Sequence, residues 1–459
     1  MTGMKDMTNP IEIAAHAVEL ARGPGATDAE AWLQSRKTSR VSVRVGQVEE
    51  LSDAESSVLV LRAFFGGQVA TVYTADLSPE GMRQLVMQSV DLARFIEPDP
   101  FAGLPDGQLA DPSLDPALDL YDDDLFAASP ATLADLAKRA EDAARGYDPR
   151  ITNSEGVIVE RGLTETTLVN SRGFSGSYHA TGCSLSAAVI ADDADNKKRS
   201  GRWSTSARFL SCLDDPEQTG RKAAERAIRQ LGACPIATQT APVVWDPAAG
   251  EYLLDFFANA ASGRLLNEGT TYLSGRESQS IAAPNVSIVD DPLLPGGLGS
   301  RPFDDEGCLP RPVRIISGGV FNGFLFDSYQ ARRAGRASNG HAGRGYQGND
   351  FALGIQPSNL SLVPGDRAPD AIVSEVEQGL YFTQLGGVSL NQTTGDLSLG
   401  AVGRWIERGQ LTYPVSEITV AGRIPDLLAS IDAIGNDPVR LGSITVPTFR
   451  VSRMTISGR

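Results

Sequence analysis

Hydrophobic residues change their spacing several times along the first half of the chain, and each change predicts a new element. A spacing near 3.6 over residues 10–22 predicts an amphipathic helix, with Asn9 as N-cap and Pro10 in the first turn. Between residues 29 and 73 the spacing is two, which is typical of antiparallel strands. Helices are also expected over 78–96, 130–145 and 216–232, and strands over 29–36, 41–48, 57–65, 68–73, 156–161, 165–170, 173–179, 184–191 and 201–208.

In the second half, one long helical pattern is followed by many short apolar runs. The helix is predicted over residues 247–266, and a shorter helix over 424–434. Short strands between Gly and Pro turns predict a strongly curved or barrel-like sheet with a few helices against it. The strands are expected over 242–245, 286–289, 314–317, 320–326, 380–383, 388–391, 396–406, 409–411, 418–421 and 448–456.

These patterns predict an α+β protein with two domains. Residues 1–235 form an N-terminal α+β domain of helices and antiparallel sheet, with an inner break near 99–129, where Pro, Asp and Gly are frequent. Residues 240–459 form a C-terminal β-rich domain.

Composition excludes some classes of partner. The 459 residues carry 41 basic and 57 acidic side chains, and the net charge of −16 repels nucleic acid and anionic membrane. No run of about eighteen apolar residues exists, and the N-terminus lacks the apolar core of a secretory signal, so we expect a cytoplasmic location and no membrane contact. The four cysteines are far apart, which favours reduced thiols over disulfides.

The stretch 323–346 concentrates arginine and glycine in an otherwise acidic chain. It carries Arg332, Arg333 and Arg344 and one of only three histidines, His341. Guanidinium groups and glycine backbone N–H groups can hold an anion or a peptide terminus. A solvated basic turn explains the same residues equally well, and both interpretations stay open.

Several separate motifs then resemble one known family, the TldD/PmbA family, and specifically its PmbA (TldE) branch. They are DSYQARR at 327–333, NGHAG at 339–343, YPVSEITVAG at 413–422, GND at 435–437 and the D-x-E-G turn within FDDEG at 303–307. The resemblance is strong over the C-terminal half and extends to the N-terminal half through the order of elements.

The resemblance implies a cytoplasmic two-protein peptidase. In it a TldD chain carries zinc on an HExxxH helix and a downstream cysteine, and a TldE chain completes a closed chamber. When the zinc pattern is laid on this chain from the shared Gly269-Thr270, Leu254 and Asn259 stand where the histidines would be and Asp255 stands at the glutamate. Leu and Asn do not replace imidazole ligands. The chain is therefore expected to hold no cofactor of its own and to be inactive alone, with zinc in a TldD-like paralogue.

The same resemblance suggests roles for the unusual residues. His341, Arg332, Arg333 and Arg344 are expected to line a substrate chamber or contact the partner, and Asp255 to lie in the chamber wall. A purely structural role for the loop, and a helix-surface acid at Asp255, remain alternatives. The predicted partners are the TldD-like paralogue and a peptide substrate, and a homodimer of the isolated chain stays open.

Two other functions stay open at this point. An independent hydrolase could use Ser328 or Ser416 as nucleophile, but neither serine lies in a GxSxG context and histidines are few. A modulator or binding protein acting on another macromolecule is the other alternative, because the family is also known as a gyrase modulator.

Overall fold

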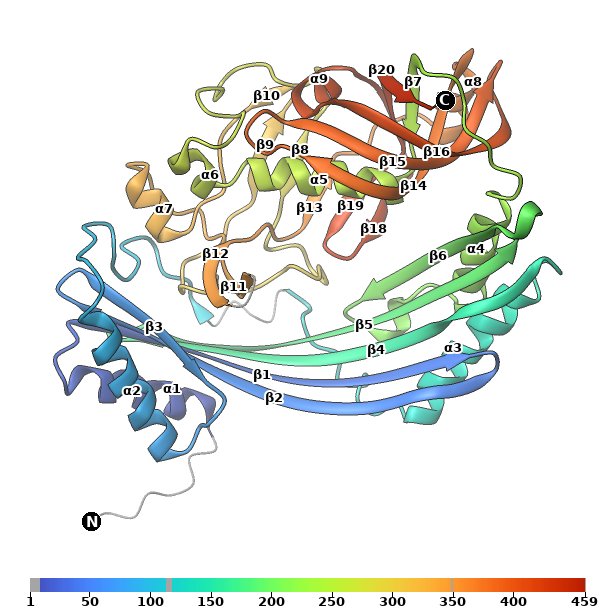
Figure 1. The fold of residues 1–459 in the computed structure, drawn as a ribbon. Coiled ribbons are helices and arrows are strands. Elements are labelled where there is room, and N and C mark those ends of the chain that lie inside the picture. The colour runs from blue at the N-terminus through green and yellow to red at the C-terminus, as the bar shows by residue number, and fades with distance from the viewer. Residues whose placement is uncertain (1–8, 113–117, 348–349, 459) are drawn as a thin grey trace.

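A computed structural model describes residues 9–112, 118–347 and 350–458. Within the N-terminal half, six antiparallel strands form one sheet in the order β3-β2-β1-β4-β5-β6. The sheet bends into a half-barrel whose concave face is turned toward the C-terminal half (Figure 1). The strands are β1 (Asp28–Arg44), β2 (Gln47–Phe65), β3 (Gln68–Thr74), β4 (Ile151–Asn170), β5 (Ser175–Asp192) and β6 (Lys198–Ala207).

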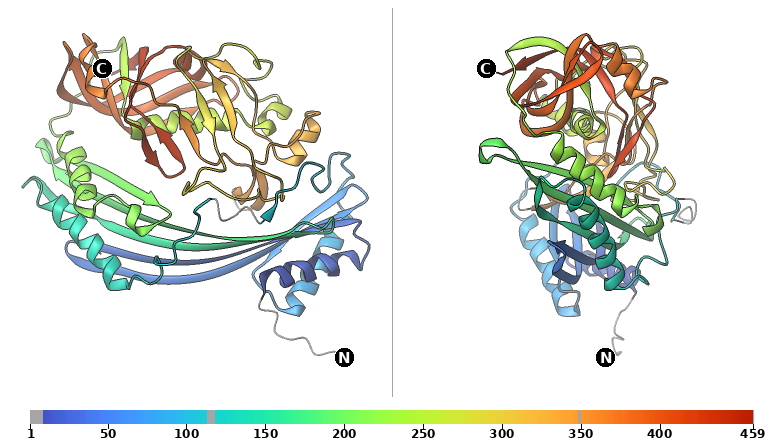
Figure 2. Two further views of the ribbon diagram at one scale, coloured as in Figure 1. Left: turned by 180° about the vertical axis from the view of Figure 1, so that it is seen from behind. Right: turned by 90° about the vertical axis from the view of Figure 1, so that its right-hand side faces the viewer.

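Four helices cover the convex face of the half-barrel in two pairs, one at each end of the long strands (Figures 1 and 2). Each helix begins with a side-chain N-cap followed by proline, so the sequence sets each start locally. The second pair packs closely because a Cβ at Gly220 would lie 1.9 Å from the carbonyl oxygen of Ala140. The helices are α1 (Pro10–Arg22), α2 (Pro79–Ala93), α3 (Pro130–Arg145) and α4 (Pro216–Ile228), and two 3₁₀ turns lie at Ala194–Asn196 and Leu210–Cys212.

The C-terminal half contains a five-stranded barrel. Its strands follow the order β16-β15-β14-β7-β20, and a pairing of β16 with β20 closes the ring, with β17 added beside β20. Trp245 fills the core, stacked on Phe449 at 5.5 Å and edge-on to Phe382 at 4.8 Å. The strands are β7 (Gln239–Trp245), β14 (Gln378–Leu390), β15 (Asp396–Glu407), β16 (Gln410–Arg423), β17 (Ile431–Ile434) and β20 (Phe449–Ser457).

A second sheet and a small hairpin complete this half. The sheet has the order β10-β9-β8-β13-β19-β18, and the hairpin β11-β12 reaches down to the half-barrel (Figure 1). The strands are β8 (Ile288–Asp290), β9 (Val313–Ser317), β10 (Val320–Phe321), β11 (Ala342–Gln347), β12 (Asp350–Ile355), β13 (Leu360–Leu362), β18 (Val439–Leu441) and β19 (Ile444–Val446). The helices are α5 (Pro247–Ala260), α6 (Gly263–Glu268), α7 (Ser328–Arg333), α8 (Pro369–Ser374) and α9 (Ile424–Ala429).

The predicted α+β class with a strand-rich, curved C-terminal sheet is confirmed, but several element boundaries were wrong. The strands predicted in pairs over 156–170 and 173–191 are each one longer strand. The strand predicted over 41–48 spans the end of β1, a turn and the start of β2, and β2 starts ten residues before the predicted 57. The first part of β2, residues 47–56, is exposed on both faces, so it shows no alternation to reveal it.

Three predicted elements of the C-terminal half also end early. The helix expected over 247–266 breaks after Ala260, because Ser262 caps a new helix and Gly263 N–H donates to the Leu325 carbonyl. The strand expected over 320–326 ends at Phe321, and Leu325 instead forms an isolated bridge with Ser262. The helix expected over 424–434 ends at Ala429, and the residues after it pair with β20. The hairpin β11-β12 was not predicted, since glycines interrupt its alternation.

Among the described residues, no helix combines the length and the apolar character needed to cross a membrane.

Candidate functional site

Helix α5 lies on the side of the C-terminal half that faces the half-barrel (Figure 1). Asp246 caps it by accepting from Ala248 N–H, and Leu254 packs with other apolar residues in the core beneath it. Its polar face carries Glu251 and, one turn further on, Asp255. Desolvation raises the pKa of both carboxyls, and the Asp255 carboxylate raises that of Glu251 further. The helix therefore presents two carboxyls that keep their protons to higher pH than free ones.

Two adjoining cavities separate α5 and β14 from β6 and α4. One has a volume of about 800 Å³ and the other about 470 Å³, and both are lined by Trp203 and Ser204. Glu251 and Tyr252 line the smaller cavity. Together these cavities form what we call the interdomain cleft, which is large enough for several residues of an extended peptide.

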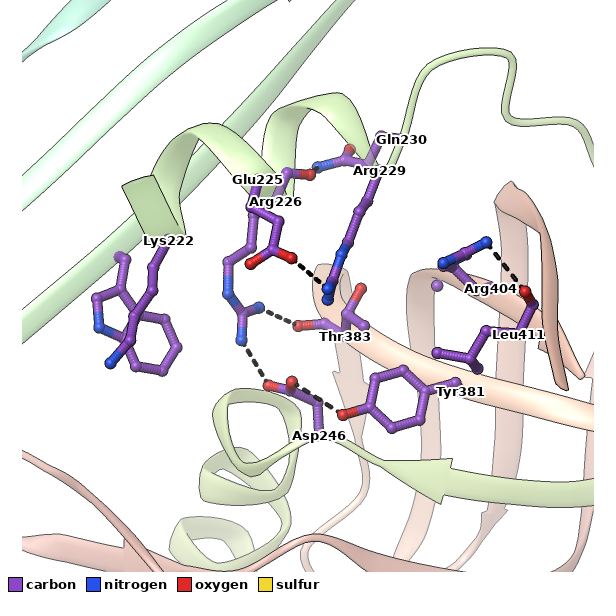
Figure 3. Close-up of a pocket in the computed structure, with 12 residues that line it drawn as sticks. Lys222, Glu225, Arg226, Arg229, Gln230, Asp246, Tyr381, Thr383, Arg404 and Leu411 are labelled. Atoms are coloured by element: carbon purple, nitrogen blue, oxygen red, sulfur yellow. Dashed lines mark hydrogen bonds and ion pairs between the residues drawn. The ribbon is translucent and has the colours of Figure 1, made fainter. Parts of the chain in front are cut away.

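Figure 3 shows the wall of the cleft where α4 meets the C-terminal half. Arg226 on α4 makes an ion pair of 2.7 Å with Asp246 and donates to the Thr383 carbonyl at 3.0 Å. The Arg226 guanidinium also lies 4.7 Å from the ring centre of Trp203. The Tyr381 hydroxyl donates to Asp246 at 3.4 Å, and burial, followed by the Asp246 charge, raises the Tyr381 pKa. These contacts fix the N-terminus of α5 to the half-barrel.

His341 is buried where the stretch 323–346 contacts the second sheet. Its Nε2 is 2.8 Å from Asp290 Oδ2, and neither side chain has exposed surface. Its Nδ1 lies 3.0 Å from Asn339 Oδ1, and Asp290 also accepts from Ser358 N–H. All polar atoms of the imidazole are therefore engaged within the chain.

Arg344 joins the hairpin β11-β12 to the half-barrel. It pairs with Glu30 on β1, and its guanidinium lies 5.8 Å from the ring centre of Trp32. Glu30 in turn binds Arg62 on β2 at 2.8 Å, and Arg62 lies 3.4 Å from Glu306 in the D-x-E-G turn. We call this group the sealed junction, because none of its charged side chains is more than 8% exposed.

Two acids at the edge of the sealed junction have strongly altered protonation. Burial, followed by the Glu306 charge, raises the pKa of Asp304 to about 8. The same two causes raise the pKa of Asp327, the N-cap of α7, to about 6. With these two acids included, four carboxyls accompany the two arginines of the junction, and protonation of Asp304 and Asp327 relieves the excess negative charge.

The other two candidate arginines, Arg332 and Arg333, lie in the last turn of α7. Arg332 donates to the carbonyls of Phe101 at 2.7 Å and Gly103 at 2.8 Å, and it lies 3.3 Å from Asp106. Arg332 therefore fastens the long connection between α2 and α3 to the C-terminal half. Arg333 is exposed, and its guanidinium lies 5.8 Å from the ring centre of Tyr329.

The structure thus separates the predicted site residues. Arg344 lies in the sealed junction, His341 and Arg332 make other contacts within the chain, Arg333 is at the surface, and Asp255 is on the cleft helix. Whether they act on a substrate or a partner stays a prediction. The charged residues Glu30 and Arg62 were not singled out from the sequence, although each interrupts an apolar stretch of a strand, which is the signal that would have found them.

The donor set on α5 does not fit zinc. Leu254 is 2% exposed and packed in the core, and Asp255 and Asn259 supply only a carboxylate and an amide. The three histidines are distributed over α1, β5 and residue 341. Among the described residues, no group of three or more His, Cys, Asp or Glu side chains could hold a metal ion.

The sequence and the fold are both similar to those of known proteins. Family models described as PmbA/TldA metallopeptidase domain 1, central domain and C-terminal domain match residues 29–93, 123–231 and 238–458. Metalloprotease PmbA of Escherichia coli O157:H7 is 32% identical, with 96% of this chain and 95% of that protein covered. A Metalloprotease PmbA homolog of Haemophilus influenzae is 30% identical, with 97% and 96% covered. The crystal structure of TldE from Thermococcus kodakarensis shares the fold, with a TM-score of 0.86, 20% identity and 97% and 99% covered.

Proposed function

The chain belongs to the PmbA/TldD metallopeptidase family, and from that membership we propose that it is the TldE-type, non-catalytic subunit of a two-chain zinc peptidase. The partner is a TldD-like paralogue that carries the HExxxH helix. The substrate is an unfolded peptide, which the assembled enzyme degrades or trims. The proposal also places the complex in the cytoplasm.

The observation that carries the proposal is the face of α5. A metal-bearing chain needs imidazoles there, and this chain has Leu254 turned into the core with Asp255 and Asn259 at the surface. The interdomain cleft nevertheless lies beside Glu251 and Tyr252 of the helix, and the Arg226–Asp246 pair holds the helix in place. A retained chamber wall without a metal site suits a subunit that encloses and positions the peptide.

Within this role, the chain's own residues have two tasks. The cleft walls exclude water and leave room for an extended chain. The carboxyl of Glu251 lines that space and can accept a hydrogen bond from a peptide N–H or amino group, and Asp255 lies one turn further along the same helix. The partner's HExxxH helix would hold the zinc and would supply the activated water for peptide cleavage.

An independent serine hydrolase finds no support in the environment of the candidate nucleophiles. Ser328 is buried and its hydroxyl lies 3.5 Å from the sulfur of Cys308, while Ser416 accepts from Arg199 at 3.3 Å. In the described part of the chain, neither hydroxyl bonds to a histidine. The surroundings of both serines therefore argue against a nucleophilic role.

The test is to measure zinc content and cleavage of an unstructured peptide by this chain alone, by the HExxxH-bearing paralogue alone and by the mixture. We expect zinc and chelator-sensitive cleavage only where the paralogue is present, with most activity in the mixture. Stoichiometric zinc and cleavage in this chain alone would overturn the proposal.

The modulator alternative is tested by the same preparation. If this chain binds a basic protein in the absence of the paralogue, and the mixture has no peptidase activity, the binding function replaces the peptidase function. The net charge of −16 is compatible with a basic protein partner but not with direct contact to DNA.

A further inference from the structure

A separate cavity of about 440 Å³ lies between the concave face of the half-barrel and the loops around residues 298–301 and 356–358. Three arginines line it, and each is at least 91% buried: Arg208, Arg301 and Arg344 are 8%, 9% and 7% exposed. We call this cavity the arginine pocket. Its other polar lining consists mainly of hydroxyl and amide groups, from Thr164, Thr166, Tyr178, Ser300, Ser358 and Gln356.

Arg344 is already paired with Glu30, and the arginine pocket still carries more positive than negative charge, because Arg208 and Arg301 face a single acid. Asp305 is the only acid among its described lining residues, and it already accepts from Trp32 Nε1 at 3.1 Å and from Arg344 N–H at 2.5 Å. Arg208 is held by carbonyl oxygens rather than by a carboxylate, and burial lowers its pKa. A buried guanidinium without a counter-ion is unfavourable, so the lining is suited to an anion.

Several donors around the pocket are unused. Among the described residues, Arg301 has one recorded acceptor, the Gln356 carbonyl at 3.5 Å, and its Nε has none. The Nε of Arg344 and the hydroxyl of Ser358 are also buried without a partner. Unsatisfied polar groups of this kind are rare in folded proteins, and three of them belong to residues that line one cavity.

A groove leads away from the pocket along the half-barrel. The adjacent cavity, of about 250 Å³, shares Thr164, Ala180 and Arg208 with the arginine pocket. Gly162 on β4 and Gly182 on β5 face each other in it, and a Cβ added at either meets nothing nearer than 3.8 Å. The glycine pair leaves an open path for an extended chain.

We propose that the arginine pocket binds the free C-terminal carboxylate of an extended peptide, whose preceding residues follow the glycine groove. This inference rests on the proposed function, since it takes peptide as the ligand. Guanidinium groups bind carboxylates with two parallel hydrogen bonds, and the pocket volume suits a terminal residue rather than a lone ion. The site would orient the peptide by its end and leave its sequence free.

The test measures binding to the isolated chain, without metal or partner. The probes are a fluorescein-labelled peptide of glycine, serine and alanine with a free C-terminus, and the same peptide with a C-terminal amide. We expect the free acid to bind about 10- to 100-fold more tightly, as lost charge-assisted hydrogen bonds imply. Equal affinity of the two peptides would overturn the proposal. Tighter binding of inorganic phosphate than of the free-acid peptide would also overturn it and assign the pocket to a phosphate ligand.

Single substitutions test whether the peptide binds in the arginine pocket and the glycine groove. Arg301→Gln should reduce the free acid to the affinity of the amide, and Arg83→Gln on the exposed surface of α2 is the matched control that should change neither. Gly162→Val narrows the groove and replaces no arginine, so it should weaken the binding of both peptides. The proposal therefore remains testable if Arg301→Gln does not fold. An unchanged preference in Arg301→Gln, or unchanged binding in Gly162→Val, would contradict the proposed placement.

Failure of this inference can be told apart from failure of the proposed function. If the mixture with the paralogue cleaves peptide but the isolated chain shows no preference for the free acid, only the carboxylate site is wrong. If the preference is found and the mixture never cleaves, the site stands and the peptidase role is wrong.

Discussion

Among the charged contacts that join the half-barrel to the C-terminal half, the sealed junction and the ion pair at the interdomain cleft differ in burial. At the sealed junction, Glu30 and Glu306 have no exposed side-chain surface and Arg62 has 8%. At the interdomain cleft, Arg226 and Asp246 are 16% and 14% exposed and border a cavity. Each place links a strand or helix of one half to the other half through arginine.

The difference shows how similar pairs serve different purposes. Charges that are fully withdrawn from water are costly to separate, so the sealed junction fixes how the two halves are placed. Charges beside a cavity keep part of their hydration, so the Arg226–Asp246 pair is less costly to separate. The arginine pocket combines the two conditions, because its arginines are buried but the space in front of them is open.

The largest loss of stability is expected for Arg62→Met in the sealed junction. It leaves the Glu30 and Glu306 carboxylates without a shared cation, and we expect a loss of about 3–5 kcal/mol of unfolding free energy. Denaturant unfolding followed by circular dichroism measures this loss. Adding Glu306→Gln to Arg62→Met should recover part of it, and a loss below about 1 kcal/mol would mean that the junction does not hold the halves together.

The next effect comes from pH at the edge of the sealed junction. Because the pKa of Asp327 is about 6 in the folded chain against the ordinary value of 3.8 for an aspartate, the native state binds more protons than the unfolded state between these values. Stability therefore falls as pH rises from about 4 to 6, and the loss persists above that range.

Asp327→Asn keeps an N-cap side chain and removes the charge. It should be about 2–3 kcal/mol more stable than the parent chain at pH 7 and no different at pH 4. Thermal melts across this pH range give the comparison. A parent chain that gains stability between pH 4 and 6 relative to Asp327→Asn would have the opposite sign and refute the assignment.

Arg226→Met removes the ion pair with Asp246 at the interdomain cleft. The pair it breaks is partly exposed, so we expect a loss of about 1–2 kcal/mol, well below that of Arg62→Met. Equal losses for the two variants, measured in the same denaturant, would show that burial does not distinguish the two places.

The smallest effect is expected at Arg333, which is exposed on α7. Arg333→Gln should change the unfolding free energy by less than about 0.5 kcal/mol, since only its contact with Tyr329 is lost. If Arg333 contacts the partner, the same variant should weaken assembly with the paralogue in sedimentation experiments. A large loss of stability would mean that Arg333 is a structural residue instead.

The helices of the N-terminal half could be predicted because Asn9, Ser78, Ser129 and Asp215 cap them from within the local sequence. The first part of β2 could not, because solvent contacts both of its faces and alternation disappears. The candidate site was less predictable than the fold. Arg344 and Glu30 are 314 positions apart, and no local pattern shows that they meet.

The central claim is that the catalytic metal chemistry belongs to the partner and not to α5 of this chain. The most direct measurement is the cleavage rate of the two-chain complex with Asp255→Asn in this chain, compared with the complex in which the glutamate of the partner's HExxxH motif is glutamine. We predict that Asp255→Asn keeps the rate within about tenfold, whereas the partner's substitution abolishes cleavage. Loss of cleavage with Asp255→Asn, together with full activity of the partner's variant, would place the catalytic carboxylate on this chain and contradict the account.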